Sequence, residues 1–73
     1  MRNGKQNYMS EITAAHNFIL DHPNDIKLSN FIMYVSRTPN LIHSDRWSLV
    51  YDFMKENYPN NMDLVTGMTY WLE

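Results

Sequence analysis

Hydrophobic residues along this chain recur at intervals of three and four positions, which is the periodicity of an α-helix. Four such segments are separated by breaks that each contain a proline: Pro23, Pro39 and Pro59. No segment alternates at every second position, as a half-buried strand does. The pattern therefore predicts an all-α fold with four helices and no strand.

The first predicted helix spans about residues 10–21, with Ser10 as its N-cap. The segment 22–25 ends it, because Pro23 disfavours helix in the residue before it. The second helix, at about residues 25–36, has the clearest apolar stripe, with spacing i, i+3, i+4 and i+7. We expect the four residues of that stripe in the core: Leu28, Phe31, Ile32 and Val35.

The third predicted helix follows a connection at residues 37–44, in which Pro39-Asn40 is the turn signal. Ser44 or Asp45 caps its start, and it runs to about Asn57. Between Leu49 and Met54 only Asp52 is polar, which makes the helix apolar around most of its circumference. That suits a central helix or one covered by a partner. The i, i+3, i+4, i+7 spacing recurs at Trp47, Val50, Tyr51 and Met54. We expect Trp47, Val50 and Met54 in the core, together with Trp71 of the last helix.

The fourth predicted helix runs from about Asn61 to the last residue and contains Gly67. Glycine costs a helix about 1 kcal/mol relative to alanine. Either a close packing approach requires it or the weakness is tolerated, and we favour the close approach.

Length and composition place these helices in one small domain, residues 10–73, behind a flexible tail at residues 1–9. The 73 residues are 44% hydrophobic and include no cysteine, so apolar packing, with or without a partner, must stabilise the fold in place of disulfides. No apolar run approaches the roughly 18 residues of a membrane span or resembles a signal peptide. We therefore expect a cytoplasmic protein with no membrane partner.

The charge balance argues against electrostatic capture of nucleic acid. Six basic residues against eight acidic ones give a net charge of −2, and the basic residues are scattered along the chain. Small helical domains nevertheless bind nucleic acid with a few well-placed side chains. The alternative hypothesis of a nucleic-acid-associated accessory or regulatory domain would use Arg37, Arg46 and Lys55.

An ordered set of motifs covers most of the chain, from about Phe18 to Trp71, and begins with Phe18-Ile19-Leu20 and Asp25. Leu28-Ser29-Asn30-Phe31 precedes the loop with Pro39, and the run from Trp47 through Val50, Phe53-Met54 and Asn57 follows it. Trp71 stands fourteen residues after Asn57. In this order the motifs resemble the YozE-like, sterile-alpha-motif-like family of small proteins from Gram-positive bacteria and their phages.

The chain departs from that family pattern near its end and in its long loop. Gly67-Met68 replaces a phenylalanine-aspartate step, one extra residue separates Asp45 from Trp47, and the loop lacks the family's phenylalanine. The resemblance implies a four- to five-helix bundle like the sterile alpha motif, with no known enzymatic activity. It supplies no catalytic residues.

The residues themselves offer little chemistry. His16 and His22 lie six positions apart, off the i, i+4 spacing that places two metal ligands on one helix face. His43-Ser44-Asp45 contains the residue types of a hydrolase triad, but adjacent residues cannot adopt the required geometry. With two glycines the chain has no phosphate-binding loop. We expect no enzyme activity, cofactor, metal or small-molecule substrate.

The ten aromatic and six methionine side chains are more informative, because these types are enriched at protein interfaces. Four candidates for partner binding lie off the main stripes or at their margins, where an interface and simple exposure are both open: Met33, Tyr34, Leu49 and Tyr70. The leading hypothesis is a non-enzymatic helical domain that binds another protein or a second copy of itself. Size and the resemblance together suggest a phage- or prophage-encoded accessory protein that contacts a host factor.

Overall fold

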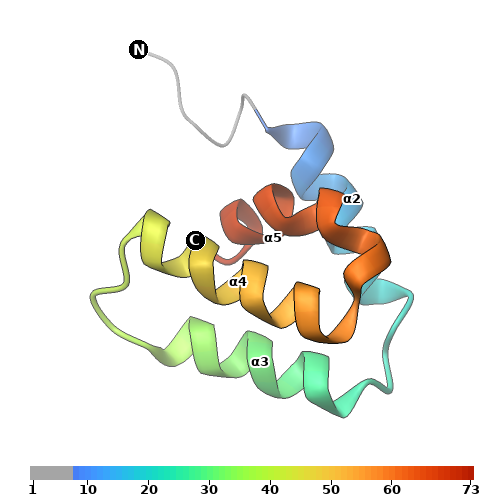
Figure 1. The fold of residues 1–73 in the computed structure, drawn as a ribbon, viewed down its shortest axis with the longest axis horizontal. Helices are drawn as coiled ribbons and strands as arrows, with labels where there is room; N and C mark the ends of the chain where they lie inside the picture. The colour runs from blue at the N-terminus through green and yellow to red at the C-terminus, as the bar shows by residue number, and fades with distance from the viewer. Residues whose placement is uncertain (1–7) are drawn as a thin grey trace.

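The computed structural model describes residues 8–73, which form four α-helices and one 3₁₀-helix and contain no strand (Figure 1). In chain order these are α2 (Met9–Leu20), α3 (Ile26–Arg37), α4 (His43–Asn57), η1 (Pro59–Leu64) and α5 (Val65–Trp71). The prediction of a small all-α bundle is confirmed.

The predicted tail is two residues too long at its folded end. Met9 begins α2, and the ring of Tyr8 stacks on that of Tyr70 with centroids 4.5 Å apart. The remainder of the predicted tail, residues 1–7, lies outside the described residues.

α4 occupies the middle of the bundle, with α5 on one side and α3 on the other (Figure 1). The most extensive backbone packing is between α2 and α5, followed by that between α4 and α5. α3 is the outermost helix and is held through its side chains. Its Phe31 ring stacks on Phe53 of α4, with centroids 4.2 Å apart and planes 9° from parallel.

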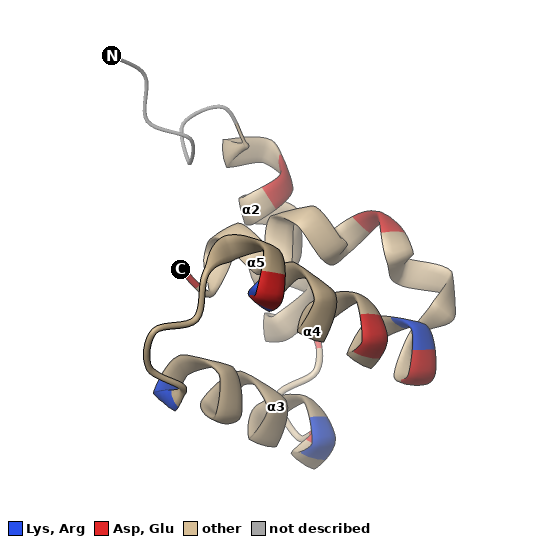
Figure 2. Cartoon of the chain, turned by 60° about the vertical axis from the view of Figure 1, so that its left-hand side comes forward, with Lys and Arg blue, Asp and Glu red and all other residues tan. Residues whose placement is uncertain are grey.

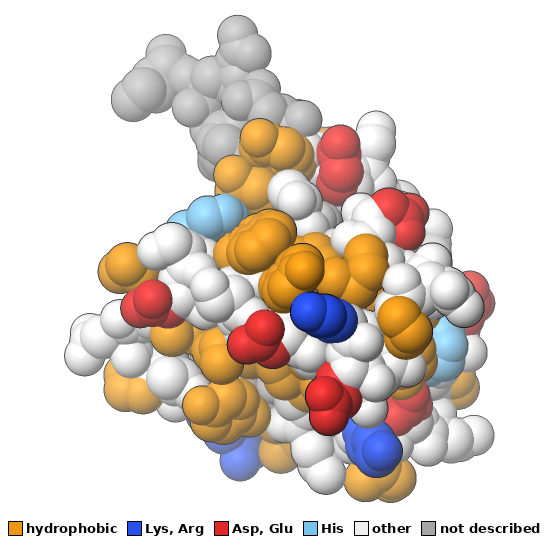
Figure 3. All heavy atoms as spheres, in the orientation of Figure 1, with side chains coloured by type: hydrophobic (Ala, Val, Ile, Leu, Met, Phe, Trp, Pro, Cys, Tyr) orange, Lys and Arg blue, Asp and Glu red, His pale blue; other side chains and the backbone are white. Residues whose placement is uncertain are grey.

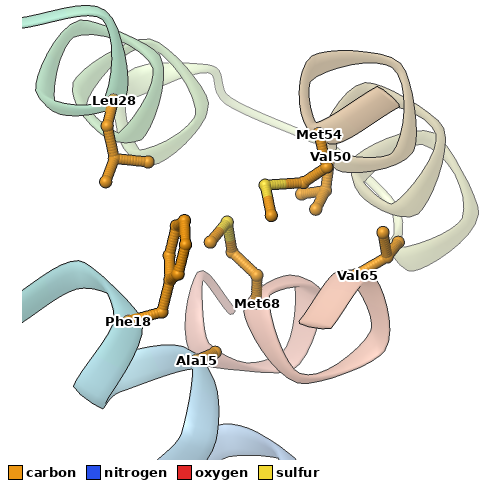
Figure 4. Close-up of a cluster of buried hydrophobic side chains, with 7 residues drawn as sticks. All are labelled: Ala15, Phe18, Leu28, Val50, Met54, Val65 and Met68. Atoms are coloured by element: carbon orange, nitrogen blue, oxygen red, sulfur yellow. The ribbon is translucent and has the colours of Figure 1, made fainter. Parts of the chain in front are cut away.

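Side chains from all four α-helices converge on one buried cluster (Figure 4). Leu28 of α3 points into it toward Phe18 of α2 and Met68 of α5 (Figure 4). The expected core residues Leu28, Val35, Val50 and Met54 are at most 3% exposed. Phe31 and Ile32 are partly buried and pack against the cluster, whose members are Ala15, Phe18, Leu28, Val50, Met54, Val65 and Met68.

Local sequence explains both ends of α3. Asp25 is its N-cap, and the carboxylate accepts a hydrogen bond of 3.1 Å from the backbone N–H of Leu28. After the helix, Asn40 adopts a φ of 61°, a left-handed conformation that asparagine tolerates better than most residues. Pro39 and Asn40 thus form the turn that their order predicts.

The predicted caps of the first and third helices are wrong. Tyr8 occupies the N-cap of α2 without a side-chain hydrogen bond, so Ser10 lies inside the helix. Ile42 occupies the N-cap of α4, so Ser44 and Asp45 lie in its first turn. Each helix begins earlier than its potential capping residues indicate, because Tyr8 and His43 are held by contacts with Tyr70 and Glu73. A capping pattern in the sequence does not include such contacts between distant residues.

The predicted last helix is divided in two. A 3₁₀-helix from Pro59 to Leu64 precedes α5, and Asn61 within it has the non-helical angles φ −120° and ψ 30°. The prediction of one continuous helix from Asn61 is therefore wrong. Pro59 and Asn61 direct the chain from α4 back across the bundle before α5 begins.

Gly67 lies where α5 crosses α2. A Cβ atom at this position would come within 2.5 Å of the carbonyl carbon of Glu11 and closer still to its oxygen. Real Cβ atoms essentially never approach other atoms so closely. The expectation that a close packing approach requires this glycine is confirmed.

Two tryptophans expected in the core lie elsewhere. Trp47 is 37% exposed, because in its turn of α4 the inward position belongs to Arg46, whose side chain is only 15% exposed. Trp47 lies about 100° further around the helix. Trp71 is partly buried outside the central cluster, where its ring lies 6.0 Å from that of His16.

Candidate interaction surfaces

The chain's own packing covers most of the apolar circumference of α4. Val50 and Met54 face the core, and Phe53 faces α3 through its stack with Phe31. The flank that remains carries Trp47 and Tyr51. The sequence allows two explanations for the apolar circumference of α4: a central position in the bundle, or cover by a partner. The central position accounts for most of it and leaves one flank exposed.

The remaining flank is a ladder of three side chains one turn apart. The ring of Trp47 stacks on Tyr51 with centroids 5.1 Å apart, and the ammonium of Lys55 lies 5.9 Å from the centroid of Tyr51. Figure 3 shows hydrophobic side chains gathered over α4 and α5, with a basic side chain at their edge. Sequence reasoning missed this surface because the i, i+3, i+4, i+7 spacing assigned Trp47 to the core.

The four predicted partner-binding residues do not form one patch. Met33 and Tyr34 are 45% and 57% exposed on α3, about 100° apart around the helix. Leu49 is partly buried on α4. Tyr70 is partly buried on α5 beside Tyr8, apart from the other three.

Tyr34 and Leu49 nevertheless share a side of the molecule. Tyr34 follows Phe31 by three residues on α3, and Leu49 precedes Phe53 by four residues on α4. Residues at these spacings lie on the same helix face. Since Phe31 stacks on Phe53 and the two helices run in opposite directions (Figures 1 and 2), both residues lie along the α3–α4 seam, toward the connecting loop.

Tyr70 belongs to a cluster that joins both ends of the described chain to the start of α4. Its ring lies against both Tyr8 and His43, with centroid separations of 4.5 Å and 4.6 Å. Nδ1 of His43 also contacts the Glu73 carboxylate. This arrangement explains why α4 begins at His43 without a side-chain cap.

Arg46 reinforces the same cluster from the inner side of α4. Its Nη2 donates a hydrogen bond of 2.8 Å to the carbonyl oxygen of Leu41, and its Nη1 lies 3.8 Å from the carboxylate of Glu73. The guanidinium therefore holds the long loop and the C-terminal segment together. It is committed to contacts within the chain.

The surroundings of Tyr70 disfavour its phenolate form and raise its pKa. Partial desolvation raises the pKa of Tyr70 above its usual value, and the charge and hydrogen bond of Tyr8 and the charge of Glu73 raise it further. Because the folded state disfavours the phenolate, the stability contribution is complete below the ordinary tyrosine pKa of about 10 and is lost as the pH rises through the higher folded pKa.

Absorbance at 295 nm, which follows phenolate formation, tests this effect. The difference between titrations of the wild type and the Tyr70→Phe variant isolates one hydroxyl, whose midpoint should lie above about 10. In chemical denaturation, the wild type should lose stability above that pH through a component that Tyr70→Phe lacks. A difference titration with its midpoint at or below the ordinary value would contradict the prediction.

The three basic residues of the nucleic-acid alternative also lie apart. Arg37 ends α3 and Lys55 lies near the end of α4, and because these helices run in opposite directions the two residues are at opposite ends of the pair. Arg46 is engaged by Glu73 and Leu41. Figure 2 shows Lys and Arg dispersed among Asp and Glu, and residues 8–73 carry four of the six basic residues against all eight acidic ones.

The histidines have local roles. His22 donates from Nδ1 to the carbonyl oxygen of Phe18 at 2.7 Å, which satisfies a group at the end of α2. His43 contacts Glu73, while Ser44 and Asp45 are exposed in the first turn of α4. Within residues 8–73 there is no group of three or more His, Cys, Asp or Glu side chains placed to hold a metal ion.

No helix in the described part of the chain has both the length and the apolar character to span a membrane. Comparison with protein-family models, curated proteins and solved structures finds no match to this chain. Its function must therefore be argued from its own surfaces.

Proposed function

We propose that this chain is a small, non-enzymatic helical domain that acts by binding protein. The observation that carries the proposal is the exposure of Met33 and Tyr34 on α3, the outermost helix, whose opposite side is already docked on the core through Leu28 and Val35. Ile26 extends the exposed apolar side chains of this helix and is 71% exposed. Large apolar side chains held on a rigid helix suit contact with another protein.

The choice of a protein partner rests on side-chain type as well as exposure. Methionine adapts to irregular surfaces, and tyrosine supplies a large contact area together with a polar hydroxyl. α3 presents one of each at adjacent positions. The ladder of Trp47 and Tyr51 offers a second aromatic surface on α4.

The biological setting is part of the same proposal. The motifs from Leu28 to Trp71 support membership of the YozE-like, sterile-alpha-motif-like proteins, and the small size supports an accessory role. We place the chain in the cytoplasm, as a phage- or prophage-encoded protein that contacts a host factor.

Affinity capture with matched baits tests the proposal. The wild-type chain, a Met33→Ser/Tyr34→Ser variant and a control with Ser29→Ala/Ser36→Ala on the same helix are immobilised, and the proteins each recovers from host lysate are identified by mass spectrometry. The wild type and the control should recover the same protein, and the Met33/Tyr34 variant should lose it. Equal recovery by all three baits contradicts the proposal. So does a wild-type bait that captures neither a host protein nor a second copy of the chain.

A further inference from the structure

α3 and α4 together form one exposed face of the bundle, which we call the outer face, and the two helices present opposite charges on it. α3 contains Lys27 and Arg37, both exposed, and has no acidic residue between Ile26 and Arg37. The side of α4 that carries Leu49 has three exposed acidic residues, Asp45, Asp52 and Glu56, whereas exposed Lys55 lies on the Tyr51 flank. In Figure 3 acidic side chains follow α4 across the middle of this face, with hydrophobic and basic side chains below them over α3.

These charges are not neutralised by one another within the chain. The two ion pairs found among residues 8–73 both use Glu73, and their cations are His43 and Arg46. The basic side of α3 and the acidic side of α4 therefore stand next to each other with their charges directed to solvent. Such a surface is complementary in charge to a second copy of itself that is rotated by 180°.

The spacings of the two charged pairs along their helix axes match. Lys27 and Arg37 are ten residues apart on α3, which is about 15 Å along the helix. Asp45 and Glu56 are eleven residues apart on α4, about 16 Å. Because α3 and α4 run in opposite directions, Lys27 lies at the same end of the pair as Glu56, and Arg37 at the same end as Asp45 (Figure 1).

We infer that the outer α3–α4 face binds a second copy of this chain, an inference that rests on the proposed function and names its partner. A two-fold axis lying in this face along the α3–α4 seam places α3 of each copy over α4 of the other without shifting the ends. Lys27 then meets the partner's Glu56, and Arg37 meets the partner's Asp45. A contact of this kind is isologous and closes at two copies.

The centre of the same face combines two large side chains with the exposed carboxylate of Asp52. Tyr34, 57% exposed on α3, and Leu49, partly buried on α4, lie on either side of the seam between the charged ends. In the two-fold arrangement the aromatic ring of one copy covers the aliphatic side chain of the other, and the four paired charges at the ends of the helices form the rim. A hydrophobic centre with a polar, charged rim is the usual organisation of a protein interface.

Exchange of charges between two variants tests the inference. Sedimentation equilibrium of the wild type should show a dimer that weakens as salt increases from about 50 to about 200 mM. Lys27→Glu/Arg37→Glu and Asp45→Lys/Glu56→Lys should each weaken self-association by about tenfold or more, because like charges then face one another. An equimolar mixture of the two variants should recover a heterodimer. Far-ultraviolet circular dichroism establishes that each variant is folded.

Lys55→Glu is the matched control, because it reverses a charge on α4 that lies on the Tyr51 flank and outside the proposed contact. It should leave the dimer constant unchanged. A wild type that stays monomeric at millimolar concentration, a mixture of charge variants that stays monomeric, or a Lys55→Glu variant as weak as the others would overturn the inference.

The two proposals fail separately. A monomeric wild type whose recovery of a host protein depends on Met33 and Tyr34 removes the second copy as partner and leaves the proposed function in place. A charge-dependent dimer, by contrast, establishes protein binding with this chain as its own partner. A monomer that recovers nothing removes both.

Discussion

Replacement of Gly67 by alanine should destabilise the domain by about 3 kcal/mol, the upper part of the range for overpacking a core. Helix propensity alone predicts the opposite sign, a gain of about 1 kcal/mol. The tertiary contact decides, because the new Cβ would meet the backbone carbonyl of Glu11 at the α2–α5 crossing. Chemical denaturation of the wild type and Gly67→Ala, followed by circular dichroism, measures the change in the free energy of unfolding.

A second substitution identifies the atoms responsible. The closest obstacles are the carbonyl oxygen and carbon of Glu11, whereas its Cβ is 3.1 Å from the new methyl group. Truncation of the side chain in a Glu11→Ala/Gly67→Ala variant should therefore restore little stability. A Gly67→Ala variant as stable as the wild type, or full rescue by Glu11→Ala, would show that the two backbones do not approach as described.

Replacement of Leu28 by alanine should destabilise the domain by about 3 kcal/mol, within the usual range for loss of a buried leucine side chain. Leu28 is 1% exposed and is the contribution of α3 to the central cluster. Its loss leaves a cavity between α3 and the rest of the bundle. The free energy of unfolding measures the total effect, and amide hydrogen exchange in α3 measures whether this helix loosens first.

Ile26 provides the control on the same helix. It is 71% exposed, so Ile26→Ala removes a similar aliphatic side chain from solvent rather than from the core. Its effect should stay within about 0.5 kcal/mol, as for surface substitutions in general. Equal losses at positions 26 and 28 would mean that α3 does not dock through Leu28.

For a domain of this size, losses of about 3 kcal/mol are large, because the whole free energy of unfolding of a small domain is about 5 kcal/mol. The Gly67→Ala and Leu28→Ala variants should therefore both be partly unfolded at elevated temperature. Their melting temperatures should fall by more than 10 °C, at roughly 4–8 °C for each kcal/mol in a domain of 60–100 residues.

The apolar stripes predict much of the fold. The i, i+3, i+4, i+7 spacing identified α3 and the burial of Leu28 and Val35, and Pro39-Asn40 identified the turn after it. These features depend on neighbours within one or two turns of the chain. Sequence spacing is sufficient for them because the interacting atoms are close in sequence.

The errors lie where contacts between distant segments compete with local signals. Trp47 has the spacing of a core residue, but Arg46 occupies the inward position because Leu41 and Glu73 receive its guanidinium. Ser44 has the character of an N-cap, but α4 begins earlier, where Glu73 and Tyr70 contact His43.

The candidate surfaces divide in the same way. The exposure of Met33 and Tyr34 follows from their distance from the α3 stripe, so the sequence could predict it. Their separation from Tyr70, and the placement of Lys27 at the end of the pair where Glu56 lies, depend on how the helices pack. A helical wheel gives directions around one axis and says nothing about which helix lies beside it.

The sequence by itself therefore determined the all-α character, the helical stripes and the supply of large apolar side chains, because short-range periodicity and backbone preferences specify them. Only the tertiary structure decided that α4 is central, that Gly67 contacts α2 and that the basic α3 lies beside the acidic side of α4. These features arise from the close approach of segments that are distant along the chain, so no local pattern encodes them.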